Sequence, residues 1–295
     1  MRRRGRRPLE DRVVVVTGAA RGLGAALAGE LARRGARPAL LGHDRPGLEA
    51  VAAALPTPAL AVEVDVTDAQ ALEDAAREVR GRLGRPSAVV ANAGIAEGGT
   101  FATSDPAAWR QVVEVNLTGS AHTARAFLPD LIATRGYFLQ VASLAALGAT
   151  PMLSAYCASK AGVEAFAHSL RAEVAHQRVA VGIAYPTWTD TDMIRDAERY
   201  AAVHGLRARM PPPLRAVHPV EAVADRLARA VERRRPAVCV PGSLRLLQIT
   251  RPAVPPVVLR VSRRLLPRLD AGEPLPGTGR LGAGGGSAGR REAGG

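Results

Sequence analysis

The chain has 295 residues, 47% of them hydrophobic and 23% charged, so it can bury a large aliphatic core and needs no disulfide or metal ion to fold. Its formal net charge of +13 comes largely from arginines near the two ends, which predicts solvated arms around a near-neutral body. No RNA- or DNA-binding module is visible in the sequence, so we expect no nucleic-acid partner. No apolar run approaches 18 residues, and none follows the basic N-terminus as in a signal peptide, so the expected location is the cytoplasm.

Strand-like apolar runs alternate with helical patterns, which predicts βαβ units. The first run consists of valines only, as expected of a strand buried on both faces. The fold class is therefore α/β: a doubly wound parallel sheet of about seven strands with helices on both faces. The predicted strands are Val13–Val16, Pro38–Leu41, Leu60–Val64, Ala88–Ala91, Tyr137–Val141, Val179–Ala184 and Ala237–Val240. The predicted helices are Leu23–Arg34, Leu48–Leu55, Ala69–Leu83, Pro106–Arg135, Ala155–His176 and Pro219–Arg234.

Two later segments break this alternation. Residues 192–217 contain three consecutive prolines and are predicted to be irregular and mobile. Residues 244–269 mix aliphatic side chains with arginine, but Pro255, Pro256 and Pro267 argue against one long amphipathic helix, so membrane contact there is an alternative that we do not favour. We divide the chain into a basic disordered arm (1–8), a single α/β domain (9–242), a basic and apolar extension (243–270) and a disordered Gly/Ala/Arg-rich tail (271–295).

A glycine-rich turn follows the first predicted strand. The run Thr17-Gly18-Ala19-Ala20-Arg21-Gly22-Leu23-Gly24 leads directly into a helix, so that backbone N–H groups and the positive helix end can face a pyrophosphate. Gly18 permits the tight turn, Gly22 lets the backbone approach the ligand, and Gly24 allows close helix–strand packing. The turn therefore predicts a dinucleotide-binding site.

The spacing Thr-Gly-x3-Gly-x-Gly resembles that of the short-chain dehydrogenase/reductase family, which has a Rossmann-type fold. The resemblance covers about residues 9–242. It implies that Asp65, in Val64-Asp65-Val66, meets the adenine amine together with its neighbour Val66. It also implies that the cofactor lies along the backbone of Asn92-Ala93-Gly94, whose Asn stabilises the sheet.

Dinucleotide folds read the adenosine ribose at the end of the second strand. An acidic residue there bonds the 2′-hydroxyl of NAD, whereas the 2′-phosphate of NADP prefers a cation. In the family register this position is Gly42, and His43 and Arg21 stand where NADP-preferring relatives carry cations. Asp44 could still reach a ribose, so NADP(H) is favoured over NAD(H) with the NAD(H) alternative left open.

Tyr156 and Lys160 lie four residues apart, on one face of a predicted helix. A phenol with a pKa of about 10 is a poor base at neutral pH, but a nearby ammonium favours the phenolate. Lys160 is the only lysine among 40 basic residues, and its compact charge differs from the guanidinium used elsewhere in this chain. The pair predicts proton transfer by Tyr156, and we count both residues among those that hold the cofactor.

Ser143 and Asn116 complete the catalytic set that the resemblance implies. Ser143 precedes Tyr156 by 13 residues, as in the family, where its hydroxyl holds the substrate oxygen while charge develops on it. Asn116 lies within a predicted helix, although Asn is a mediocre helix former. In the family this Asn bends the helix and holds a water in a proton relay through the lysine.

The segment after the sixth strand departs from the family. It reads Pro186-Thr187-Trp188-Thr189-Asp190-Thr191, where relatives usually carry Pro-Gly-x3-Thr. Thr191 matches the Thr that contacts the carboxamide region, and Pro186 and Thr189 join it in the predicted cofactor site. Thr187 replaces the glycine and would be strained at a positive φ. The bulky residues of this region predict either ordinary packing or a lid over an apolar, bulky ketone or alcohol; they are Trp188, Met193, Tyr200, His204 and Met210.

Together these motifs predict an NADP(H)-dependent oxidoreductase, working as a homodimer or homotetramer, that interconverts a ketone or aldehyde and an alcohol. The alternatives are an NAD(H)-dependent alcohol dehydrogenase of the same family and a non-catalytic dinucleotide sensor or scaffold, which does not need the proton-transfer set. Cys157 and Cys239 lack CxxC or zinc spacing, so we expect free thiols and no metal site.

Overall fold

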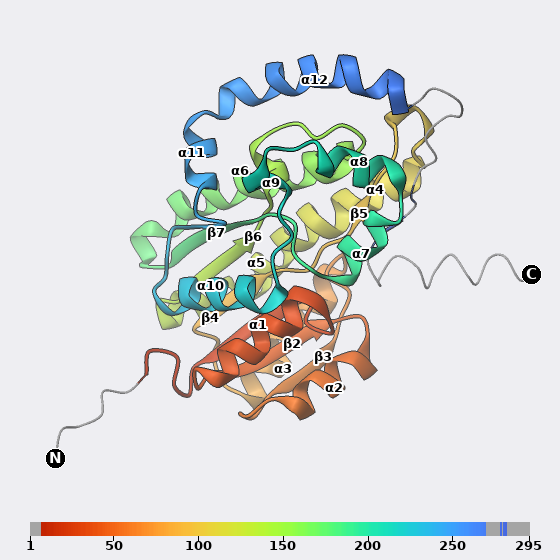
Figure 1. The fold of residues 1–295 in the computed structure, drawn as a ribbon. Helices are drawn as coiled ribbons and strands as arrows, with labels where there is room; N and C mark the ends of the chain where they lie inside the picture. The colour runs from red at the N-terminus through yellow and green to blue at the C-terminus, as the bar shows by residue number, and fades with distance from the viewer. Residues whose placement is uncertain (1–6, 270–277, 279, 282–295) are drawn as a thin grey trace, which may run out of the picture.

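The computed structural model describes residues 7–269, 278 and 280–281 (Figure 1). Its main sheet has the order β3-β2-β1-β4-β6-β7-β8, and each neighbouring pair is parallel. This confirms the predicted α/β, Rossmann-type doubly wound sheet of seven strands. The strands are β1 (Val13–Thr17), β2 (Arg37–Gly42), β3 (Leu60–Glu63), β4 (Ala88–Ala91), β6 (Tyr137–Val141), β7 (Ala180–Pro186) and β8 (Ala237–Val240), with β5 (Ala96–Glu97) and β9 (Arg280–Leu281) in a separate pair.

Helices cover both faces of the main sheet (Figure 1). The strand β1 shows why: Val13 and Val15 pack on the face covered by α3, α5 and α6, whereas Val14 and Val16 pack on the face covered by α1, α2 and α10. The helices are α1 (Gly22–Arg33), α2 (Arg45–Ala54), α3 (Ala69–Arg82), α4 (Pro106–Val113), α5 (Gly119–Thr134), α6 (Ser154–Val174), α7 (Asp192–Glu198), α8 (Ala201–Ala208), α9 (Pro212–Arg215), α10 (Val220–Glu232), α11 (Leu244–Ile249) and α12 (Val254–Leu269).

The strand order reverses between β1 and β4, because β2 and β3 lie beyond β1 while β6, β7 and β8 lie beyond β4. Loops at the carboxyl ends of two such strands diverge and leave a crevice, which is where doubly wound sheets bind their ligands. The glycine-rich turn follows β1, and Asn92-Ala93-Gly94 follows β4. Both predicted cofactor motifs therefore lie at this crevice.

The helix predicted over Pro106–Arg135 is interrupted. The helix α4 ends at Val113, a π-helical turn spans Glu114–Thr118, and α5 begins at Gly119. A π-turn inserts an extra residue into a helix and frequently marks a functional site. Asn116 lies at the centre of this one, in agreement with the bend that the family resemblance implies.

Two proline-based predictions are wrong. Residues 192–217, predicted to be irregular, form the short helices α7, α8 and α9. The helix α12 is continuous over 16 residues despite its three prolines. Pro255 and Pro256 occupy its first turn, where an N–H has no partner within the helix, and Pro267 falls in its last turn. In Figure 1, α11 and α12 run along the outside of the molecule, beyond α6 and α8.

The two ends of the chain are described only in part. Residues 1–6 of the predicted arm and most of the tail 271–295 lie outside the described residues, and the boundaries proposed for the domains stay predictions. The tail departs from predicted disorder at Arg280 and Leu281, because β9 pairs antiparallel with β5 and buries Leu281. Both cysteines are free thiols, as predicted. Within the described ranges, no helix is both long and apolar enough to cross a membrane.

Candidate active site

The turn after β1 has the shape predicted from its glycines. Gly18 and Gly22 have φ values of +65° and +54°, a backbone conformation that side chains disfavour. A Cβ on Gly24 would lie 2.1 Å from the Gly18 carbonyl oxygen, so only glycine lets α1 start this close to the turn. Arg21 precedes the helix in an extended conformation, and the half-buried Leu23 packs against the α1 side of the core. The backbone at this turn fits the pyrophosphate of a dinucleotide.

Asn92 joins the ends of β4 and β1. Its side chain donates to the carbonyl oxygen of Thr17 at 2.9 Å, and the Thr17 hydroxyl accepts from the backbone N–H groups of Asn92 and Ala93, both at 3.0 Å. The backbone of Ala93 lies so close to Gly18 that a Cβ added to Gly18 would be 2.9 Å from the Ala93 Cα. Gly94 lies next to the catalytic residues, because a Cβ added to it would be 3.4 Å from the Lys160 Nζ.

The adenosine end contains an ion pair. Arg21 Nη2 donates to Asp44 Oδ2 at 2.7 Å, and both side chains are partly exposed, at 39% and 31%. Asp44 also caps α2 by accepting from the Gly47 N–H at 3.1 Å. His43 is exposed beside it. Arg21, which favours NADP(H), and Asp44, which favours NAD(H), thus form an ion pair with each other.

The end of β3 carries the predicted adenine contact. Asp65 is exposed, and its Oδ1 accepts from the backbone N–H and the hydroxyl of Thr67, both at 2.8 Å. This local turn holds the carboxylate in one orientation. Val66 is buried and lies against α5, where a Cβ on Gly119 would come within 2.7 Å of its side chain.

Lys160 is buried beneath the predicted catalytic tyrosine. Its side chain is on α6, its residue is 4% exposed, and its Nζ donates to the Val141 carbonyl oxygen at 3.2 Å. The same Nζ lies 5.6 Å from the centroid of the Tyr156 ring. Removal from water lowers the pKa of Lys160 to about 8, so the ammonium is charged at neutral pH but titrates well below an exposed lysine.

Tyr156 is half-buried between Lys160 and Ser143. Burial raises the pKa of the Tyr156 phenol above its ordinary value, and a side-chain hydrogen bond from Ser143 opposes that rise by favouring the phenolate. Ser143 lies after β6 and caps a short 3₁₀ helix by accepting from the Ala145 N–H at 3.2 Å. At neutral pH the phenol therefore holds its proton, which is the form that can protonate a carbonyl oxygen.

Asn116 is fully buried and connects three parts of the site. Its Oδ1 accepts from the Ile95 N–H at 2.8 Å, and its Nδ2 donates to the Ile95 carbonyl at 2.9 Å, so that one side chain pairs with one residue in both directions. Nδ2 also donates to Ser159 Oγ at 2.9 Å, and Ser159 donates to the Tyr156 carbonyl at 2.9 Å. Ser159 was missed from the sequence, where its position between Tyr156 and Lys160 on the same predicted helix is the one available signal.

A small apolar cavity lies above Ser143 and Tyr156. Its volume is about 90 Å³, and the lid candidates Trp188, Met193 and Met210 line it. Tyr200 packs beside it, whereas His204 is exposed and does not line it. The apolar lining agrees with the expectation for the substrate. The volume does not suit a bulky one, because ligand pockets typically measure about 300–1,000 Å³.

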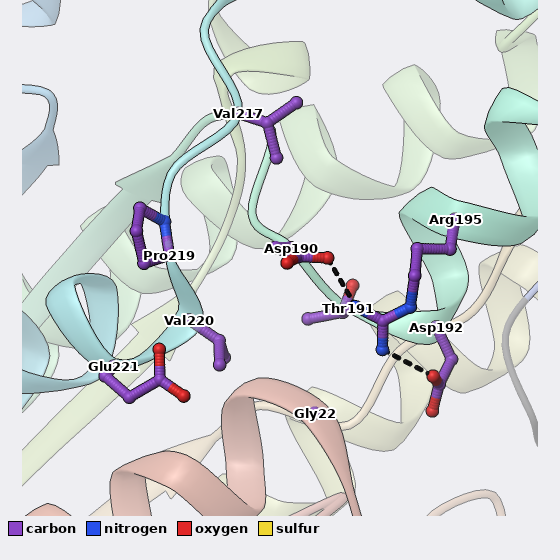
Figure 2. A pocket seen from close by; sticks show the side chains of 9 residues that line it. All are labelled: Gly22, Asp190, Thr191, Asp192, Arg195, Val217, Pro219, Val220 and Glu221. Atoms are coloured by element: carbon purple, nitrogen blue, oxygen red, sulfur yellow. Dashed lines mark hydrogen bonds and ion pairs between the residues drawn. The ribbon is translucent and has the colours of Figure 1, made fainter.

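A larger cavity of about 440 Å³ opens on the cofactor side, over Gly22 at the start of α1 (Figure 2). Figure 2 shows the starts of α7 and α10 on its two sides, with Arg195 held by Asp190 and Asp192; the Arg195–Asp192 bond measures 2.7 Å. Pro219, just before α10, and Val220 and Glu221 in its first turn line the opposite side. Arg195 and Glu221 were not predicted, because residues on α7 and α10 meet only through the tertiary fold.

The departure at Thr187 carries no positive-φ strain. Thr187 is not among the described residues with a positive φ, so a β-branched side chain fits the backbone conformation there. Its carbonyl accepts from the buried Thr189 hydroxyl at 3.1 Å, and Thr191 donates in turn to the Thr189 carbonyl at 3.3 Å. Thr191 reaches the glycine-rich turn, where a Cβ on Gly22 would lie 3.4 Å from its methyl group. Pro186 ends β7 just before this loop.

The short chain dehydrogenase family matches residues 12–201, more than half of the chain. The chain belongs to the short-chain dehydrogenase family. This makes it an NAD(P)-dependent oxidoreductase that acts on CH–OH or C=O groups, as predicted. The family match contains the glycine-rich turn and the four residues Asn116, Ser143, Tyr156 and Lys160.

Several short-chain dehydrogenase relatives are similar to this chain. It is 30% identical over 186 residues to the 3-oxoacyl-acyl-carrier-protein reductase FabG of Haemophilus influenzae, covering 63% of this chain and 77% of that protein. It is 35% identical over 186 residues to the acetoacetyl-CoA reductase of Synechocystis sp., covering 63% of this chain and 75% of that protein. The crystal structure of gox2181 superposes with a TM-score of 0.73 at 26% identity, over 78% of this chain and 94% of that one.

One relative matches further along the chain. The probable oxidoreductase EphD of Mycobacterium tuberculosis is 34% identical over 269 residues, covering 86% of this chain but only 45% of that protein. This similarity extends beyond the share of the chain that the family itself matches. The region that aligns with this chain is therefore less than half of EphD.

Proposed function

We propose that this short-chain dehydrogenase reduces a compact, apolar ketone or aldehyde to the alcohol with NADPH. The observation that carries the proposal is the buried Lys160 ammonium, 5.6 Å from the Tyr156 ring, beside an apolar cavity lined by Tyr156 and Ser143. Such a set can move a proton to or from a substrate oxygen. A non-catalytic sensor would have no use for it.

In the proposed mechanism, the nicotinamide cofactor when bound supplies the hydride. The Ser143 hydroxyl donates to the substrate oxygen and orients it, and Tyr156 gives that oxygen its proton. Lys160 favours the phenolate that remains on Tyr156. Asn116 positions the helix of Tyr156 through Ser159. The mostly apolar lining of the cavity would disfavour water at the reacting carbon.

The cofactor is proposed to lie along the crevice between β1 and β4. Its pyrophosphate would face the N–H groups after Gly18, its adenine would meet Asp65 and Val66, and its carboxamide would meet the loop from Pro186 to Thr191. The 2′-phosphate would form an ion pair with Arg21 in place of Asp44, and His43 would lie nearby. NAD(H) remains the second candidate, because the Asp44 carboxylate 2.7 Å from Arg21 could instead accept a ribose hydroxyl.

The function is tested by following cofactor absorbance with a panel of carbonyl compounds and either NADPH or NADH. We expect turnover with NADPH and several small ketones or aldehydes. No turnover of any carbonyl or alcohol with either cofactor would contradict the proposal and favour a sensor.

The cofactor preference is tested by fluorescence titration of two matched variants. Arg21→Ala is expected to weaken NADPH binding about tenfold or more, because a hydrogen bond to a charged group contributes about 1.5–3 kcal/mol, and to leave NADH nearly unchanged. Asp44→Asn keeps the cap of α2 but releases Arg21, so it should strengthen NADPH binding. Tighter binding of NADH than of NADPH by the wild type would reverse the assignment.

A further inference from the structure

The C-terminal part of the chain returns to the candidate active site. The strand β9 pairs antiparallel with β5, with Ala96 opposite Leu281 and Glu97 opposite Arg280. Just before β9, the Thr278 N–H donates to the Gly98 carbonyl at 2.6 Å, and the Gly98 N–H donates to the Thr278 hydroxyl at 2.7 Å. Since β5 follows the Asn92-Ala93-Gly94 motif after β4, this pairing holds Thr278, Arg280 and Leu281 next to the candidate active site.

The same segment also contacts the lid side of the site. Tyr200, between α7 and α8, donates its hydroxyl to the Thr278 carbonyl at 3.0 Å. Arg280 and Leu281 are therefore paired with β5 on one side, and Thr278 is hydrogen-bonded to Tyr200 on the other. A segment with partners on both sides has a defined place in the pocket wall.

Leu281 fills the space between these two sides. It is 4% exposed, and it packs with Ala96, Ala197 and Val203 in a cluster that the half-buried Tyr156 and Trp188 adjoin. It lines the same cavity of about 90 Å³ as Ser143 and Tyr156. A ligand pocket of ordinary size is at least about three times larger, so the space left beside Leu281 suits a compact group only.

We propose that Leu281 is a specificity-determining residue, and that the chain's own C-terminal strand limits the size of the carbonyl substrate. The side chain occupies volume that a longer substrate would need, and β9 holds it there through backbone pairing. The inference concerns the substrate class of the proposed reductase and therefore rests on that proposed function. It assigns a role to a segment that lies outside the family match.

The test compares full-length Leu281→Ala and Leu281→Phe with the wild type on a series of methyl ketones from 2-butanone to 2-nonanone. The measured quantity is the ratio of kcat/KM for 2-nonanone to that for 2-butanone. Leu281→Ala should raise this ratio about tenfold or more, since even one methylene in an apolar pocket changes discrimination by about 10–200-fold, and Leu281→Phe should lower it. Leu259→Ala, at a leucine 53% exposed on α12, is the matched control and should leave the ratio unchanged.

Two truncations test the strand as a unit. A chain ending at Leu281 keeps β9 and should retain the wild-type ratio, whereas a chain ending at Leu269 loses β9 and should behave like Leu281→Ala. The inference is overturned if Leu281→Ala and the shorter chain, both folded by circular dichroism, keep a ratio within twofold of the wild type.

A binding experiment separates failure of the size limit at Leu281 from failure of the proposed reductase function. If the wild type turns over no ketone, the same variants are compared by binding 2-nonanone, with Trp188 fluorescence as the signal in a Trp109→Phe background, because Trp188 lines the cavity. Tighter binding of 2-nonanone by Leu281→Ala than by the protein that keeps Leu281, both in the Trp109→Phe background, still supports the size limit. Equal binding overturns it without any appeal to turnover.

Discussion

At the scale of single residues, the chemistry depends on how burial changes the pKa values of two neighbouring groups, Lys160 and Tyr156. Burial lowers the pKa of Lys160 to about 8 and raises that of Tyr156, so at neutral pH one is a cation and the other a neutral acid. This is the protonation pattern that carbonyl reduction needs. A chain that otherwise uses arginine as its only basic long side chain keeps a lysine at this one position.

Replacement of Tyr156 by Phe removes the proton donor and leaves the ring. We expect Tyr156→Phe to reduce kcat by about a hundredfold or more, the usual contribution of a positioned acid or base. Cofactor affinity, measured by fluorescence titration, should stay within a few-fold of the wild type. Turnover at the normal rate would rule out Tyr156 as the proton donor.

The rate of reduction should depend on pH through Lys160. Its pKa is about 8, so it is charged below that pH and neutral above it. A neutral Lys160 no longer stabilises the Tyr156 phenolate, so kcat/KM for reduction, which reports groups of the free enzyme, should be high below pH 8 and fall as the pH rises through about 8. In Lys160→Arg the cation persists to a pH of about 12, so whatever activity remains should lack this fall. The same midpoint in both profiles would point to another group.

At the scale of elements, the turn between β1 and α1 depends on the absence of a side chain. A Cβ on Gly24 would lie 2.1 Å from a backbone oxygen of Gly18, which cannot move without opening the turn. By contrast, Gly81 in α3 has nothing within 4 Å of its Cβ position. Alanine substitutions at Gly24 and Gly81 should therefore change the free energy of unfolding in opposite directions.

We expect Gly24→Ala to lower the free energy of unfolding by about 3 kcal/mol or more and to abolish dinucleotide binding. Gly81→Ala should raise it by about 0.4–1 kcal/mol, since alanine loses less backbone entropy in a helix, and leave binding intact. Urea denaturation and cofactor titration measure both effects. Equal stability of the two variants would show that the turn relaxes to accept a side chain.

At the scale of the whole molecule, the extension is attached to the catalytic helix through a charge pair. Arg251 Nη2 lies 2.9 Å from Glu164 Oε2 on α6, one turn beyond Lys160, and donates to the Ala146 carbonyl at 3.0 Å. Glu164 is 6% exposed at its side chain and also accepts from the Tyr185 hydroxyl at 2.8 Å. The extension is therefore held to the domain next to the site.

Arg251→Ala should lower the free energy of unfolding by about 1 kcal/mol, because it leaves a buried carboxylate with one partner fewer. The value is modest since the Arg251 side chain is 46% exposed and solvent screens the pair. Arg260→Ala, at an exposed arginine of α12, is the control and should change stability by less than about 0.5 kcal/mol. If the two variants unfold together in urea, the pair does not hold the extension in place.

The sequence by itself determined the sheet, the glycine-rich turn and the order of the catalytic residues, because strand burial and backbone geometry are local properties written in apolar runs and glycine spacing. It missed α12, since a proline count ignores position: Pro255 and Pro256 stand in the first turn, where no internal hydrogen bond is lost, and Pro267 stands in the last turn, where only one is lost. Only the tertiary structure decided which distant residues meet: the Arg21–Asp44 pair, Ser159 under Asn116, and Leu281 in the pocket. Such contacts join positions far apart in the chain, and no local pattern encodes them.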